Sequence, residues 1–307
     1  KRLVEASFAD SVFFNNSGAE AVETSIKMAR KYHDAQGHPE RYRVVTCEGA
    51  FHGRTLATIA AGGQEKHLAG FGPVVDGFDQ VAFGNLNEMR AAIGPETAAI
   101  LVEPVQGEGG VHVADPAFLR AARAACDEAG SLLVFDEVQS GFGRTGRLFA
   151  FEHSGVVPDI LCLAKSIAGG LPLGATVVRS GIGLVPGTHG STFGGNPIAC
   201  AVARATLDVL LDSDLIEQVD RIGELICQPV RSRSPKIVRE IRQVGLMIGI
   251  QLKQPARPFV RALQERGVLA LSAGKSVLRL LPPLVLTDAE ATQVGRLLAD
   301  VLCPSDA

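Results

Sequence analysis

Two residues of opposite charge stand at the ends of short apolar segments in the middle of the chain. Asp136 follows the segment Leu132–Phe135, and Lys165 comes two residues after Ile160–Leu163. Short, continuously apolar segments are typical of strands in a sheet that is covered on both faces. Ligands of open α/β sheets bind beyond the carboxyl ends of the strands. We therefore expect Asp136 and Lys165 to lie at one site. The alternative to a catalytic role for the two residues is a plain salt bridge between their side chains.

The residues around Lys165 favour covalent chemistry. Ser166, Ile167 and Ala168 follow the lysine and lead into two glycines, which gives it an apolar, tightly turned setting. Burial there would lower the pKa of the lysine amine and make it nucleophilic, as formation of a Schiff base requires. Asp136 would then serve another partner, such as a pyridine nitrogen that must stay protonated.

A segment near the start of the chain is suited to a phosphate group. Val12–Phe14 is predicted as a strand, and the following Asn15–Ala19 (NNSGA) opens a predicted helix. A helix N-terminus offers free backbone N–H groups to a phosphate, and Gly18 would allow close approach. Ser17-Gly18 is also an ordinary helix N-cap. Together with a Schiff-base lysine and a carboxylate for a pyridine, however, the segment points to pyridoxal 5′-phosphate.

The pattern along the chain predicts the elements that position these residues. Apolar segments alternate with stretches of helical period, which indicates parallel βαβ units up to about residue 213. From about Ile216 the pattern changes to that of a smaller α+β domain, so we expect domains at 1–213 and 214–307. The remaining predicted strands are Arg43–Thr46, Ala99–Val102, Ala175–Val178, Leu246–Leu252 and Val277–Leu281, and the predicted helices are Ala19–Lys31, Pro116–Glu128, Ile222–Ile226, Pro258–Glu265 and Asp288–Leu302.

Composition excludes several classes of protein. The net charge of −3, two tyrosines and no tryptophan argue against nucleic-acid binding. The six cysteines are far apart, which argues against a disulfide framework or a zinc site and for a reducing cytoplasm. No apolar segment is long enough for a membrane span. Acidic residues interrupt the first residues, which resemble the end of a helix rather than a signal peptide, so we expect an N-terminal segment to be missing.

Two glycine-rich segments imitate nucleotide-binding motifs. Residues 141–146 (GFGRTG) match G-x-G-x-x-G, but Asp136 and Glu137 precede them and would repel a pyrophosphate. Residues 273–276 (AGKS) resemble the end of a phosphate-binding P-loop, but Leu269 stands where the first glycine is required. We expect neither segment to bind a nucleotide.

Seven motifs in order resemble the class III pyridoxal-phosphate aminotransferases, from about residue 2 to residue 300. They are FFNNSGAEA, EGAFHGRTLAT, VEPVQGEGGV, LLVFDEVQSGFGRTG, PDILCLAKSIAGGLPLGA, PGTHGSTFGGNP and VLRLLPPL. The subgroup that they resemble most is that of the acetylornithine aminotransferases. The resemblance implies the aspartate-aminotransferase-type fold (fold type I), with a large α/β domain on a mostly parallel sheet and a smaller C-terminal α+β domain.

The resemblance also implies roles for individual residues toward the cofactor. Lys165 would form the Schiff base and carry the proton, and Asp136 would keep the pyridine nitrogen protonated. Thr192 would reach the phosphate bound by a partner subunit, which implies a homodimer with shared active sites. The other cofactor contacts implied are Phe51 and Val138 on the two ring faces, Gln139 near the ring hydroxyl, and Ser17, Gly18 and Ala19 at the phosphate.

Four further residues are implied in substrate binding: Ser191, Arg54, Arg279 and Glu108. Arg54 would hold a carboxylate of the amino donor, and Arg279 would hold the α-carboxylate of 2-oxoglutarate when it is not paired with Glu108. The chain departs from the family pattern at several places, among them Asn15, where a cysteine is frequent, Val22, where an asparagine is frequent, and Lys275-Ser276, just before Arg279.

The implied reaction is transfer of the amino group of N-acetylornithine to 2-oxoglutarate, as in arginine biosynthesis. Another ω-aminotransferase, acting on succinylornithine, ornithine or 4-aminobutyrate, is the first alternative. A non-catalytic relative is the second, and the presence of both Lys165 and Asp136 argues against it.

Overall fold

The computed structural model describes residues 1–303, which form two compact units. The first unit comprises residues 1–104, 114–141 and 150–209, and the second comprises residues 105–113, 142–149 and the chain from Leu210 onward. Two short segments, 105–113 and 142–149, therefore belong to the second unit although the chain before and after each of them belongs to the first. The predicted division into domains 1–213 and 214–307 remains a prediction.

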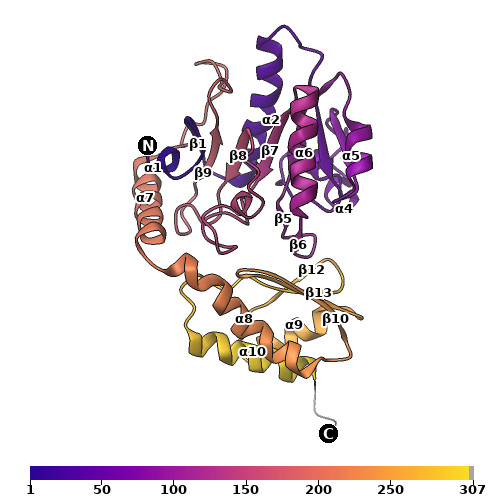
Figure 1. Ribbon diagram of the computed structural model, residues 1–307, viewed down its shortest axis with the longest axis vertical. Helices are drawn as coiled ribbons and strands as arrows, with labels where there is room; N and C mark the ends of the chain where they lie inside the picture. Colours follow the sequence, from indigo (N-terminus) through magenta and orange to yellow (C-terminus); the bar gives the residue numbers. More distant parts are fainter. Residues whose placement is uncertain (304–307) are drawn as a thin grey trace. The chain divides into compact units, whose positions relative to one another are not determined.

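The first unit is built on a seven-stranded sheet (Figure 1). Its order is β1-β9-β8-β7-β4-β2-β3, and every pairing is parallel except the two made by β9. The predicted α/β class with a mostly parallel sheet is thus confirmed. The strands are β1 (Ser11–Asn15), β2 (Arg43–Cys47), β3 (Phe78–Val81), β4 (Thr97–Val102), β7 (Leu132–Asp136), β8 (Ile160–Leu163) and β9 (Gly174–Val178).

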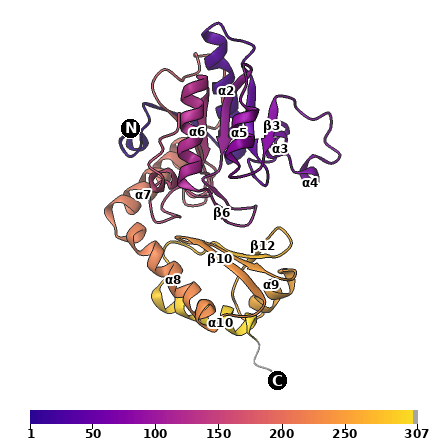
Figure 2. The ribbon, with the colours of Figure 1, turned by 45° about the vertical axis from the view of Figure 1, so that its right-hand side comes forward.

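Helix α2 (Gly18–Ala35) covers one face of this sheet. Its small buried residues Ala21 and Ala29 pack into a cluster with residues from β4, β7 and β8, such as Leu101 and Val134. Figures 1 and 2 show α2, α5 and α6 running beside the strands. The other helices that begin in this unit are α1 (Arg2–Glu5), α3 (Leu56–Gly62), α4 (Glu65–Leu68), α5 (Leu86–Ala92), α6 (Pro116–Ala129), the short 3-10 helix Ala150–His153 and α7 (Pro197–Asp212).

As far as residue 303, the second unit has an antiparallel four-stranded sheet and the three helices α8, α9 and α10. The strand order is β10-β11-β13-β12, and a separate pair is formed by β5 and β6. Gly295 of α10 allows two helices to approach closely, because a Cβ there would lie 2.6 Å from the Leu225 carbonyl oxygen of α8. The elements are β5 (Val105–Gln106), β6 (His112–Val113), α8 (Leu215–Arg233), β10 (Val238–Val244), β11 (Met247–Leu252), α9 (Arg257–Gln264), β12 (Leu271–Ala273), β13 (Val277–Leu280) and α10 (Asp288–Leu302).

Between residues 1 and 303, none of the helices is both long enough and apolar enough to cross a membrane.

Candidate active site

Asp136 and Lys165 emerge at the same edge of the large sheet. Strands β7 and β8 are parallel neighbours, Asp136 is paired with Cys162 at their carboxyl ends, and Lys165 follows three residues later. The Glu137 backbone N–H donates to the Cys162 carbonyl oxygen at 2.9 Å and extends this pairing. The predicted common edge is therefore present.

The structure corrects the expected environment of Lys165, which is exposed rather than buried within this chain. The reason is its place beyond the end of β8, where the neighbouring Gly169 and Gly170 are exposed and have no side chains with which to cover it. The apolar residues of this segment, Ile167 and Ala168, turn into the protein instead.

Asp136 forms a buried pair with His52, a residue to which the sequence motifs gave no role. The Asp136 side chain is 4% exposed, and its Oδ2 lies 2.8 Å from His52 Nδ1. Its Oδ1 accepts a hydrogen bond from the Val138 backbone N–H at 3.0 Å. Both carboxylate oxygens thus have partners other than Lys165, so a plain Asp136–Lys165 salt bridge is not needed to explain the burial of this charge. The two contacts hold the carboxylate in one orientation.

Glu137, the next residue, has a structural task. Its carboxylate oxygens accept hydrogen bonds from the backbone N–H groups of Ala150 and Phe151, at 2.5 and 2.7 Å. Burial raises the pKa of Glu137 to about 8, although the two N–H donors act in the opposite direction. Glu137 therefore fastens the point where the chain returns to the first unit after residue 149.

The segment predicted to hold a phosphate begins helix α2. Ser17 is the N-cap, and its hydroxyl oxygen accepts a hydrogen bond from the Glu20 backbone N–H at 3.2 Å. Gly18 lies against Val138, since a Cβ at Gly18 would be 2.7 Å from Val138 Cγ1. The helix N-terminus is therefore packed directly on the residues that follow Asp136.

The loop before helix α3 packs on the same helix N-terminus. Gly53 has φ +137°, and a Cβ there would lie 2.7 Å from Ala19 Cβ. The neighbouring Phe51 N–H donates to Glu103 Oε2 at 2.9 Å. Arg54 is exposed, and its Cζ lies 5.2 Å from the Phe51 ring centroid. Residues 17–19, 51–54 and 136–138 thus form one contact region.

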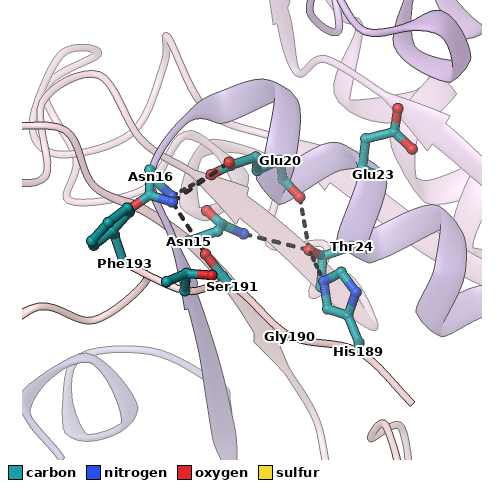
Figure 3. Close-up of a pocket in the computed structure, with 10 residues that line it drawn as sticks. Asn15, Asn16, Glu20, Glu23, Thr24, His189, Gly190, Ser191 and Phe193 are labelled. Carbon is teal, nitrogen blue, oxygen red and sulfur yellow. Dashed lines mark hydrogen bonds between the residues drawn. The ribbon is translucent and has the colours of Figure 1, made fainter. Parts of the chain in front are cut away.

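A polar pocket of about 390 Å³ adjoins this region (Figure 3). Asn16 bridges its walls, because its backbone N–H donates to Glu20 Oε2 at 2.5 Å and its Nδ2 donates to Ser191 Oγ at 3.1 Å. A second link joins Thr24 Oγ1 and His189 Nε2 at 3.0 Å. Exposed Thr192 also lines this pocket. The segment that carries Ser191 and Thr192 is therefore tied to Asn16, just before the N-cap of α2, and through His189 to Thr24 in the second turn of that helix.

Two predicted substrate residues meet in the second unit. Arg279, on β13, is 4% exposed, and its Nη1 lies 2.8 Å from Glu108 Oε1. Glu108 lies in the connection between β5 and β6, where the neighbouring Gly110 has φ +126°. The Glu108–Arg279 ion pair named from the sequence is therefore present.

Sequence reasoning overlooked His52 and Glu103, both of which are almost fully buried. Glu103 directly follows strand β4, just as Asp136 ends β7, so the rule that singled out Asp136 could have found it. His52 stands between Phe51 and Arg54 in a motif that was noted, but only the fold brings it to Asp136.

A mostly parallel sheet with a fixed carboxylate and a lysine at neighbouring strand ends is the arrangement expected of a pyridoxal-phosphate enzyme of the aminotransferase fold. The model of the class-III aminotransferase family matches residues 1–302, and the chain belongs to this family. It is 55% identical to the acetylornithine aminotransferase of Mesorhizobium japonicum over 94% of this chain and 74% of that one. The acetylornithine aminotransferase of Agrobacterium fabrum is 53% identical over 95% of this chain and 75% of its own.

Solved structures agree with this assignment. The ornithine aminotransferase of Toxoplasma gondii superposes with a TM-score of 0.94 at 36% identity, over 98% of this chain and 74% of that chain. A second structure of that enzyme has pyridoxal phosphate at partial occupancy in its active site. Pyridoxal 5′-phosphate is the cofactor of this class of enzyme.

The residues at the sheet edge fit this cofactor. Two buried nitrogen atoms there, Gln139 Nε2 and His52 Nε2, have no hydrogen-bond partner among the described residues. Gln139 Nε2 is a donor that a ring oxygen could satisfy, and Asp136 offers a fixed negative charge for a protonated ring nitrogen. The N-terminus of α2 offers backbone N–H groups for a phosphate. The set therefore supplies an acid, an amide donor and an anion-binding helix end.

Proposed function

We propose that the protein transfers the amino group of N-acetylornithine to 2-oxoglutarate, giving N-acetylglutamate 5-semialdehyde and glutamate, in arginine biosynthesis. The observation that carries this proposal is the buried Asp136–His52 pair, on the strand beside the one that leads to Lys165. Curated relatives at 53–55% identity are acetylornithine aminotransferases, which supports the choice of donor.

Distinct residues would hold the different parts of the cofactor. Ser17, Gly18 and Ala19 would bind its phosphate at the start of α2, and Asp136 would bind its ring nitrogen. His52 would keep the Asp136 carboxylate in place through the 2.8 Å contact. Phe51 and Val138 would contact the two ring faces, and Gln139 would donate to the ring hydroxyl.

Lys165 is the residue that would do the proton chemistry. When bound, pyridoxal phosphate supplies a carbonyl that takes up the amino group and a ring that accepts electrons. Lys165 Nζ would attach the cofactor covalently, be released by the incoming amine, and then move a proton at the substrate carbon. Asp136 favours the protonated form of the ring nitrogen, because an opposite charge stabilises a cation.

Carboxylate recognition would be divided between two arginines. Arg54 would bind the α-carboxylate of the donor, which is far from the reacting amine, and Ser191 would assist in donor binding. Arg279 would bind the α-carboxylate of 2-oxoglutarate. During the first half-reaction Glu108 would occupy Arg279, so that this arginine does not attract the wrong carboxylate.

Replacing Glu108 by alanine is expected to change the preference between donors. The almost buried Arg279 would lose its partner and attract the α-carboxylate of glutamate. The ratio of α- to ω-transamination should rise by a factor that corresponds to about 1–3 kcal/mol. Single-turnover rates with glutamate and with N-acetylornithine measure this ratio.

Glu108→Gln is the matched control, since it keeps the size and a hydrogen-bonding oxygen but removes the charge. It should give an intermediate ratio. Equal slowing of both half-reactions in Glu108→Ala, with the donor preference unchanged, would show that Glu108 is only structural.

A homodimer in the cytoplasm is the proposed state of the enzyme. Phe193, which follows Thr192, and Ile198, in the first turn of α7, are both 73% exposed, and Val209 is exposed three turns further along α7. Apolar surface of this kind marks protein interfaces. Sedimentation equilibrium should give twice the chain mass, and Ile198→Asp should shift the protein toward monomer. A monomeric parent protein would contradict the proposal.

The donor is tested by one panel of amines with 2-oxoglutarate as acceptor. N-acetylornithine should give the highest kcat/KM, above succinylornithine, ornithine and 4-aminobutyrate. A higher value for any of the other three would reassign the protein to another ω-aminotransferase. Absence of any turnover by cofactor-loaded protein would favour the non-catalytic alternative.

A further inference from the structure

The second unit contains a small basic cavity that none of the roles above uses. It has a volume of about 280 Å³ and lies where strand β11 ends and the β12–β13 hairpin turns. Residues from three separate segments line it: Arg239, Gln251, Leu252, Lys253, Gln254, Pro255, Lys275 and Ser276.

Three cationic side chains line this cavity without a counter-charge. Arg239, Lys253 and Lys275 form no ion pair within residues 1–303, and no aspartate or glutamate of that part of the chain lines the cavity. The carboxylate next to Arg239 in sequence, Glu240, is paired with Arg242 at 2.5 Å. Like charges gathered at one place repel each other, and an anion bound between them would relieve that repulsion.

A β-bulge brings Arg239 into this set. In the pairing of β10 with β11, Val238 is opposite Leu252 and Glu240 is opposite Gln251, so Arg239 is an extra residue in its strand. Bulges redirect the side chain at which they occur, and Arg239 lines the cavity together with Lys253.

Hydrogen bonds fix the frame of the cavity. The Leu252 N–H donates to the Ser276 carbonyl oxygen at 2.8 Å, and the Ala256 N–H donates to the Lys275 carbonyl oxygen at 3.0 Å. Gln251 Nε2 donates to Ser276 Oγ at 2.7 Å. Gly274, at φ +60°, makes the turn that leads to Lys275 and Ser276. The three segments are therefore held together before any ligand binds.

We propose that this cavity binds the phosphate group of a small phosphorylated metabolite, at a site separate from the cofactor site. A phosphate monoester carries close to two negative charges on three oxygens, which matches one guanidinium fork and two ammonium groups better than a monocarboxylate does. The Gly-Lys-Ser sequence thus acts in a hairpin turn. It does not form a P-loop, because Ser276 leads into strand β13 rather than into a helix.

The test is titration of the cofactor-saturated enzyme with inorganic phosphate, measured by calorimetry at constant ionic strength. Saturation with cofactor keeps the phosphate-binding end of α2 filled, so that heat from a second site is measured. We expect one phosphate per chain. Lys275→Gln and Arg239→Gln should each weaken binding about tenfold, because each removes a charge-assisted hydrogen bond.

Lys236→Gln is the matched control. Lys236 is exposed and three residues from Arg239, but it does not line the cavity, so this variant should change the affinity less than about twofold. Acetate at the same ionic strength should not displace the phosphate. The proposal is overturned if phosphate does not saturate, if Lys236→Gln weakens binding as much as Lys275→Gln, or if acetate competes equally well. None of these measurements depends on which amino donor the enzyme uses.

Discussion

Lys165→Ala is expected to bind pyridoxal phosphate but to lose turnover by about 10³-fold or more, because in the proposed mechanism this one residue would be both the nucleophile and the proton carrier. Lys165 is exposed at the end of β8, so its removal leaves no cavity in the core. The fold and the melting temperature of the cofactor-free protein should therefore be unchanged. The visible absorbance band of cofactor attached to the protein should disappear.

Lys165→Arg separates charge from nucleophilicity. Arginine keeps the positive charge, but it cannot form the covalent link because its guanidinium stays protonated. This variant should be as inactive as the alanine variant. Substantial transamination by either variant, in a preparation free of the parent enzyme, would show that Lys165 is not the residue that carries the cofactor.

Asp136→Asn should give the second largest loss of activity. The side-chain oxygen of the introduced amide could still accept a hydrogen bond from His52 Nδ1, so the change removes a charge and keeps the shape. The pKa of a ring nitrogen bound there would fall, and each unit of that fall is worth about 1.4 kcal/mol. Because the Asp136 side chain is only 4% exposed, we expect the pKa of that ring nitrogen to fall by several units. The expected loss in kcat is about 10³-fold.

Glu137→Gln provides the comparison, because it also replaces a buried acid by its amide, one residue beyond the end of β7. Glu137 accepts hydrogen bonds from two backbone N–H groups, so its replacement should lower the melting temperature far more than the kcat of the folded enzyme. If Asp136→Asn keeps near-normal turnover, the ring nitrogen is bound by another residue. If both variants lose activity equally, the loss in Asp136→Asn is only structural.

The sequence predicted strand ends well, because a buried parallel strand is recognisable by its continuous apolar residues. Strand β8 (Ile160–Leu163) has the predicted bounds, and among the helices α10 (Asp288–Leu302) does as well. Strand β3 was overlooked because Phe78–Val81 includes polar Asp79 and Gln80, which an edge strand tolerates. Strand β12 has only three residues, two of them exposed, and gives no such signal either.

The contacts that shape the site were harder to predict. The approach of Gly53 to Ala19 and the pair His52–Asp136 join residues more than thirty positions apart. A local sequence pattern cannot indicate contacts between residues so far apart in the chain. The burial of Lys165 was predicted wrongly, because apolar neighbours in sequence do not determine whether the turn beyond a strand end is covered.

The division of the second unit into three stretches of chain has a consequence for how the protein is made. Gly110 accepts a hydrogen bond from Arg242 across 132 positions, and the Leu246 N–H donates to the Arg144 carbonyl oxygen. Val105 and Val111, both buried, pack against Met247. A ribosome adds only about 5–20 residues per second. Val105 and Val111 therefore remain exposed on the nascent chain for seconds, until the strand that contains Met247 has been synthesised. During this interval the nascent chain needs protection from aggregation.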